Sequence, residues 1–242
     1  LTHTATQEIA LREGASIVGV YLGYTHPMQQ VGITDGMQES RNSLSVAYGA
    51  LQPLNEATLW IPGPYEPMAR MVLESSDWPR TLQSARPDVP APSTTAFATV
   101  FDSDNRLGMV DVTIVGQDLV DAVDSALDQM KRSGAEYVQV RLPANQPALS
   151  TFAAGLTELG LGYGALIPQF RAAEGEDQGD VLITQWVAEP DIDTSGWAFY
   201  DDRVATLAQA IVAQTKSVGN RGVQRQRRAA RRAQLFAALD GL

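Results

Sequence analysis

Residues 136–168, EYVQVRLPANQPALSTFAAGLTELGLGYGALIP, decide the fold class because they change periodicity twice. Residues 137–142 predict a strand, and residues 147–159 predict a helix that ends at Gly160. Residues 161–170 predict a second strand. A strand, a helix and a further strand in such close succession are typical of an α/β protein.

The stretch immediately upstream has the same character. Residues 107–115 predict a strand, and residues 118–132 (DLVDAVDSALDQMKR) carry apolar side chains at helical spacing. Asp118 is the expected N-cap of this helix and Gly134 its C-terminal stop. Four prolines between positions 79 and 93 predict an irregular connection. The remaining predicted strands are 17–24, 43–51, 57–61, 95–102 and 181–187, and the remaining predicted helices are 2–13, 66–75, 200–218 and 224–239.

A repeat becomes visible when these elements are aligned. The helix–glycine–strand phrase TQEIALREGASIVGVYLGY has its helix stop at Gly14, and STFAAGLTELGLGYGALIPQ has its stop at Gly160, 146 positions later. Each phrase is followed by a polar loop and another strand. The first copy lacks the roughly 90 residues that precede the helix in the second, since a second unit beginning near Ala57 has about that many. We therefore expect an upstream segment or another chain to complete the first unit.

Composition excludes several classes of protein. Of the 242 residues, 44% are hydrophobic, which excludes a disordered chain, and the absence of cysteine excludes a disulfide scaffold or a thiolate zinc site. The two histidines show no metal-ligand spacing, so we expect no metal. We expect neither a membrane span, since no stretch is long and apolar enough, nor a leader peptide, since the first residues do not have the charged-then-apolar pattern of one. The expectation is a cytoplasmic protein that does not contact a membrane.

The charge is unevenly distributed. The chain carries a formal −10, but residues 221–242 carry +5 and the preceding 220 residues carry −15. The acidic body argues against nucleic-acid binding over most of the surface. The basic C-terminal helix can dock on its own or a neighbouring chain, contact nucleic acid, or lie on an anionic membrane. Docking, including homo-oligomer formation through this arm, is favoured, because nucleic-acid binding by one short helix would be weak and salt-sensitive.

The order of the predicted elements, together with the phrases DVTIVGQDLVDAVDSALDQM (111–130) and 136–168, resembles the GNAT family of acyl-CoA acyltransferases. The phrase HTATQEIALREG resembles the late helix of the same fold in tandem GNAT-like proteins. The resemblance implies an α/β fold with a mixed sheet flanked by helices, one partial and one complete unit, and a C-terminal helical arm. The implied boundaries are 1–56 for the late part of a first unit, 57–190 for a divergent second unit and 191–242 for the C-terminal helices.

The resemblance also implies where acyl-CoA would bind as co-substrate. The family holds the pyrophosphate of CoA on a Q/R-x-x-G-x-G/A loop between the central strand and the following helix. Here that loop reads Val115-Gly116-Gln117-Asp118, so Gly116 and Gln117 are the candidate cofactor-binding residues. The loop has one glycine, and Asp118 would repel a phosphate. The tyrosine that acts as general acid in this family is replaced by Ala10 in the first unit and by Leu156 in the second. We therefore expect the second unit to be degenerate as a catalyst.

The first unit supplies the other candidates. His3 is a possible general base, and Thr6, Gln7 and Tyr24 are possible substrate-binding residues. The competing interpretations are that a threonine caps the first helix, that His3 is a surface residue and that Tyr24 belongs to the core.

Two functions follow from the resemblance. One is an acyl-CoA-dependent acyltransferase that moves an acyl group to an amine or hydroxyl, with the second unit structural. The other is a non-catalytic GNAT-like module that binds a ligand or protein and regulates an attached domain.

Overall fold

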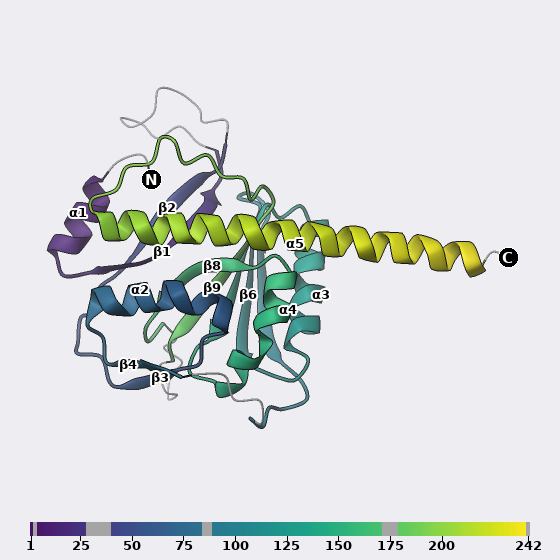
Figure 1. Ribbon diagram of the computed structural model, residues 1–242, viewed down its shortest axis with the longest axis horizontal. Helices are drawn as coiled ribbons and strands as arrows, with labels where there is room; N and C mark the ends of the chain where they lie inside the picture. Colours follow the sequence, from purple (N-terminus) through teal and green to yellow (C-terminus); the bar gives the residue numbers. More distant parts are fainter. Residues whose placement is uncertain (2–3, 28–39, 84–88, 171–178, 241–242) are drawn as a thin grey trace.

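A seven-stranded mixed sheet with helices packed on it forms the centre of the computed structural model (Figure 1). The model describes residue 1 and residues 4–27, 40–83, 89–170 and 179–240. The predicted α/β class with a large mixed sheet, flanking helices and a C-terminal helix is confirmed. In chain order the sheet strands are β1 (Ser16–Thr25), β2 (Asn42–Tyr48), β5 (Ala96–Asp102), β6 (Leu107–Ile114), β7 (Tyr137–Pro143), β8 (Gly162–Ile167) and β9 (Val181–Val187).

The strands lie in the order β2-β1-β8-β9-β7-β6-β5. Every neighbouring pair is antiparallel except β6 and β7, which are parallel and are joined by a helix, as parallel neighbours require. The helical elements are α1 (Ala5–Arg12), η1 (Gly63–Tyr65), α2 (Glu66–Ser76), α3 (Leu119–Arg132), η2 (Pro147–Phe152), α4 (Ala153–Glu158) and α5 (Asp202–Asp240).

The helices α2, α3, α4 and α5 form a layer over one face of the sheet (Figure 1). The core lies beneath this layer, where Val138 of β7 packs near Met130 of α3 at Gly108. Because residues of a strand alternate between faces, Tyr137, Gln139 and Arg141 lie on the opposite face. The sheet therefore separates an apolar, helix-covered face from a face that carries polar and aromatic side chains.

The two copies of the repeated phrase meet within the sheet, where β1 lies beside β8. Gly14 and Gly160 both adopt left-handed φ angles, 81° and 83°, at the junction between a helix and the strand that follows it. These strands are β1 and β8, which pair antiparallel with Gly19 opposite Ala165. A Cβ atom on Gly19 would lie 1.9 Å from the carbonyl oxygen of Gly164, so only glycine allows this crossing.

A short two-stranded parallel sheet lies beside the main one. It contains β3 (Ala57–Leu59) and β4 (Arg80–Leu82), and β4 falls inside the segment predicted to be irregular. Arg80 forms a two-pronged ion pair with Asp180 next to β9, at 2.5 and 3.1 Å, with both side chains almost fully buried. Three residues are too few to show a strand pattern, and β4 is held by this long-range pair that the local sequence does not reveal.

The largest correction concerns the C-terminus. The sequence predicts helices 200–218 and 224–239 separated by a break at 219–222, but α5 runs without interruption through Gly219 and Gly222. These glycines serve close packing instead. A Cβ on Gly219 would lie 2.8 Å from Pro190, and one on Gly222 would lie 3.2 Å from Gly160. Each interior glycine costs a helix about 1 kcal/mol relative to alanine, which tight packing offsets.

The predicted helix 147–159 is also divided, into the 3-10 turn η2 and the short α-helix α4. Within the described residues, no helix combines the length and apolar character needed to cross a membrane.

Candidate functional site

The end of β6 and the start of α3 form the candidate acyl-donor site. The strands β6 and β7 pair from Leu107 opposite Tyr137 to Asp111 opposite Arg141. Beyond these residues, in the described sheet, β6 pairs with β5 up to Ile114 and β7 pairs with β9 up to Pro143, but β6 and β7 no longer pair with each other. Two parallel strands that separate at their carboxyl ends leave backbone groups free to bind a ligand between them. What this segment can bind therefore depends on which partners the backbone groups at the carboxyl ends of β6 and β7 already have.

Gln146 occupies this separation. Its side-chain oxygen accepts a hydrogen bond from the Val115 amide at 2.8 Å, and its Nε2 donates to the Thr113 carbonyl at 2.8 Å. A glutamine side chain has the same donor and acceptor groups as a peptide unit. Gln146 thus pairs with β6 as another strand would.

The next amides are also engaged. Gly116 N donates to Thr95 Oγ1 at 3.1 Å, and Gln117 N donates to the Pro92 carbonyl at 2.8 Å. A Cβ on Gly116 would lie 2.3 Å from the carbonyl carbon of Thr94, so this glycine accommodates the neighbouring backbone. The residues predicted to hold a cofactor therefore direct their backbone donors to the segment around 92–95.

Asp118 makes a contact other than the one predicted. It occupies the N-cap position of α3, as predicted, but among the described residues its side chain makes no capping hydrogen bond to the helix amides. Its Oδ1 accepts a hydrogen bond from Thr95 N at 2.6 Å. Hydrogen bonding from Thr95 is the main cause that lowers the pKa of Asp118. A carboxylate that stays ionised at the start of α3 opposes an anion there.

The candidates on the first helix are not brought together with this site. His3 lies outside the described residues, and Thr6 is exposed on α1. Gln7 is buried, 2% exposed, and its amide binds the Ala198 carbonyl at 3.1 Å and the Tyr200 amide at 3.0 Å. Because both ends of the Gln7 amide are paired, Gln7 fastens α1 to the segment before α5.

Tyr24 belongs to an aromatic cluster on the polar face of the sheet. Its ring centroid lies 5.4 Å from that of Tyr21 and 5.3 Å from that of Tyr137. Burial raises the pKa of Tyr21 to about 12 and also raises the pKa of Tyr137 well above its ordinary value, so both phenols stay protonated near neutrality. Tyr24 is half-buried and packs against the core, in agreement with the competing interpretation.

Beneath this cluster lies Gln185, a fully buried residue of β9 that the sequence analysis missed. Its Oε1 accepts hydrogen bonds from Leu22 N at 2.9 Å and from Tyr137 OH at 3.2 Å. Its Nε2 donates to the carbonyls of Val20 at 3.1 Å and Tyr163 at 2.8 Å. Since β1 and β8 share a single register pair, Gln185 adds hydrogen bonds that link them, beside the bond from Tyr163 OH to the Val18 carbonyl. A glutamine within the mostly apolar strand VLITQWV is the sequence signal for it.

Arg141 is another polar group on this face. Its guanidinium carbon lies 4.9 Å from the Phe170 ring centroid, and its buried Nε has no hydrogen-bond partner within the described part of the chain. A guanidinium N–H in this position can bind an anion such as a carboxylate. The described ranges contain no group of three His, Asp or Glu side chains placed to hold a metal ion.

The chain matches no known protein family model, and no curated protein or solved structure is detectably similar to it. The site must therefore be interpreted from its own geometry.

Proposed function

We propose that residues 57–190 form a GNAT-like unit that does not bind acyl-CoA and acts as a non-catalytic, partner-binding module. The likeness to GNAT proteins is supported by the chain order of β5, β6, α3, β7, α4, β8 and β9, and by the parallel pair β6 and β7 that separates at its carboxyl end. These features are the ones in which an acyltransferase of that family would bind its donor.

One observation supports the proposal that this unit does not bind an acyl donor. The amides of Val115, Gly116 and Gln117 all donate to groups of the chain itself, and Asp118 adds a negative charge beside them. A pyrophosphate would have to displace three hydrogen bonds, each worth about 1 kcal/mol net, and then lie beside a carboxylate. The unit retains the framework of the fold while its phosphate-binding groups are used internally.

Titration calorimetry with acetyl-CoA, supported by thermal-shift measurements, tests this proposal. We expect no heat of binding and no change in melting temperature at millimolar acetyl-CoA. Binding at a dissociation constant below about 100 μM, which corresponds to roughly −5.5 kcal/mol, would overturn it. Adenosine 3′,5′-bisphosphate, the nucleotide end of CoA, serves as a second ligand that needs only the phosphate site.

Acyl transfer by the first unit is a second candidate. It is favoured by the pairing of Gly19 with Ala165, which are 146 positions apart, as are Gly14 and Gly160. This relation supports the assignment of residues 1–56 to the late part of a first GNAT-like unit. An amine or hydroxyl would attack the thioester carbon, the thiolate of CoA would leave, and His3 would accept the proton from the nucleophile. Loss of acetyl transfer in a His3→Ala variant, with unchanged melting temperature, tests this role.

A further inference from the structure

The C-terminal part of α5 leaves the body of the protein. Val218 is buried, and Arg225 forms the most C-terminal ion pair between α5 and the body among the side chains that the structure describes, at 2.7 and 2.8 Å from the two carboxylate oxygens of Asp124. Beyond it, Arg227, Arg228 and Arg231 are exposed. Figure 1 shows this end of α5, residues 226–240, projecting past the sheet and the other helices. We call it the arm; at 1.5 Å per residue it is about 22 Å long.

The charge of the arm identifies the kind of surface that it fits. Residues 226–240 carry four arginines and one aspartate, a formal +3, whereas residues 1–220 carry −15. An acidic body repels nucleic acid and anionic lipid but attracts the arm of another molecule. The complementary surface is therefore present on the chain itself.

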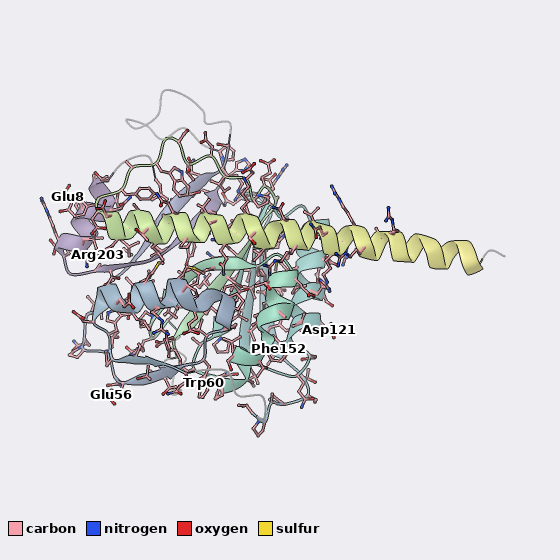
Figure 2. All side chains as sticks on the ribbon, in the orientation of Figure 1. Glu8, Glu56, Trp60, Asp121, Phe152 and Arg203 are labelled. Atoms are coloured by element: carbon pink, nitrogen blue, oxygen red, sulfur yellow. The ribbon has the colours of Figure 1, made fainter. Side chains whose placement is uncertain are left out.

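One acidic surface already binds an arginine of α5. The carboxylate of Asp124 holds Arg225, and this hydrogen bond, with the nearby charges of Glu158 and Asp128, raises the pKa of Arg225. Asp121 lies three positions before Asp124 on α3, on the same side of the helix, and is exposed; Figure 2 labels it at the outer edge of α3. We call Asp121, Asp124, Asp128 and Glu158 the acidic strip.

The arm extends away from the acidic strip of its own molecule. It continues the axis of α5 beyond Arg225, so every further residue carries it away from α3 (Figure 1). We propose that the arm of one molecule docks on the acidic strip of a second copy, and that the second copy returns the same contact. Such a reciprocal contact repeats one interface twice and closes as a two-fold dimer.

Sedimentation velocity at several ionic strengths tests the dimer in the intact chain. Because the contact is made by solvent-exposed charges, we expect a dimer at low salt that dissociates as the salt concentration rises. In the variant Arg227→Glu/Arg228→Glu/Arg231→Glu, the dissociation constant should rise roughly 100-fold, since two copies of the contact lose three exposed pairs each.

The matched control changes the same charge elsewhere. Arg12, Arg70 and Arg203 are exposed on the body, so Arg12→Glu/Arg70→Glu/Arg203→Glu alters the net charge equally and leaves the arm intact. This control should dimerise almost as the unmodified chain does. If both triple variants dissociate alike, the effect is one of net charge and the proposal fails.

A charge exchange identifies the receiving surface. A strip variant, Asp121→Arg/Asp128→Arg/Glu158→Arg, has a basic arm and a basic strip, while the arm variant has an acidic arm and an acidic strip. Each should be monomeric alone, and an equimolar mixture should form a heterodimer in which both contacts are complementary. A monomeric unmodified chain at all concentrations, a mixture that stays monomeric, or arm-dependent binding to DNA or anionic vesicles by a monomer would overturn the proposal.

Discussion

Gly19 of β1 lies directly opposite Ala165 of β8, and the two residues are separated by the same 146 positions that separate the helix-ending glycines of the two repeated phrases. Because the two strands are antiparallel, this register gives each repeated phrase the same position relative to the other phrase. The two copies therefore meet at equivalent residues, about a local two-fold axis that passes between Gly19 and Ala165.

The Gly19→Val variant tests how tightly the strands cross. Its Cβ would lie 1.9 Å from the Gly164 carbonyl oxygen and 2.6 Å from the Ala165 Cα, and both atoms belong to the backbone and cannot rotate away. We expect a loss of about 3 kcal/mol or more in the free energy of unfolding, measured by urea denaturation. Gly63→Ala, where nothing lies within 4 Å of the added Cβ, should change stability by less than about 0.5 kcal/mol. Comparable losses in the two variants would contradict the close crossing.

The Gln185→Leu variant tests the buried amide that joins β1, β8 and β7. The substitution leaves Leu22 N and the carbonyls of Val20 and Tyr163 without their side-chain partner. A buried polar group left unpaired costs about 1–3 kcal/mol, so we expect a loss of at least about 3 kcal/mol by chemical denaturation. The same substitution at the exposed Gln129 of α3 is the control. A Gln185→Leu protein as stable as the control would show that the network contributes nothing.

The interactions of Glu136 predict that the stability of the protein depends on pH. Burial alone would raise the pKa of Glu136, but hydrogen bonds and charges from Arg106 and Arg41 outweigh this effect and lower it below 4.5. The folded state therefore holds this proton less tightly than the unfolded state. The resulting stability is present above pH 4.5 and is lost as the pH falls through the lowered pKa.

Glu136→Gln should remove this contribution. We expect the variant to be less stable than the unmodified protein at pH 7, with the difference shrinking as the pH is lowered below 4.5. Melting temperatures of both proteins between pH 3 and 7 measure it. A difference that is constant across this range would contradict the assignment of the lowered pKa to Glu136.

Gln146→Ala tests the filling of the gap between β6 and β7. The Val115 amide loses its acceptor, so its hydrogen exchange should accelerate, and the free energy of unfolding should fall by about 1–2 kcal/mol. Acetyl-CoA should still not bind, because Gly116 N and Gln117 N keep their partners. Gln117→Ala is the control, since it removes only an exposed side-chain bond to Ala91. Unchanged exchange at Val115 would contradict the pairing.

The fold was predictable where the pattern is local. The helix at 118–132 and the strands beside it have strong periodicity, and Gly14, Gly134 and Gly160 end helices with left-handed φ as expected. Gly219 and Gly222 misled the prediction because the same residue type serves helix ends and close packing, and only the position of Pro190 and Gly160 in space distinguishes the two.

The candidate site was predictable only in part. The single glycine and the carboxylate of the Val115–Asp118 loop are visible in the sequence, but the hydrogen-bond partners of the loop are residues distant in sequence. Thr95 precedes the loop by about twenty positions and Gln146 follows it by about thirty, in a proline-flanked turn with no distinctive pattern. Contacts of this kind depend on the tertiary fold, so no local periodicity reports them.

The pairing of β1 with β8 also limits how many copies of the repeated helix–glycine–strand phrase can join in this way. Each strand uses one edge for the other and its second edge for β2 or β9, so neither keeps a free edge. A head-to-tail contact would leave an open edge and permit growth of the sheet, but a contact between equivalent residues consumes the same edge on both partners. Two copies of the repeated phrase therefore use up the strand edges of the β1–β8 contact. A third copy would have to join through a different surface.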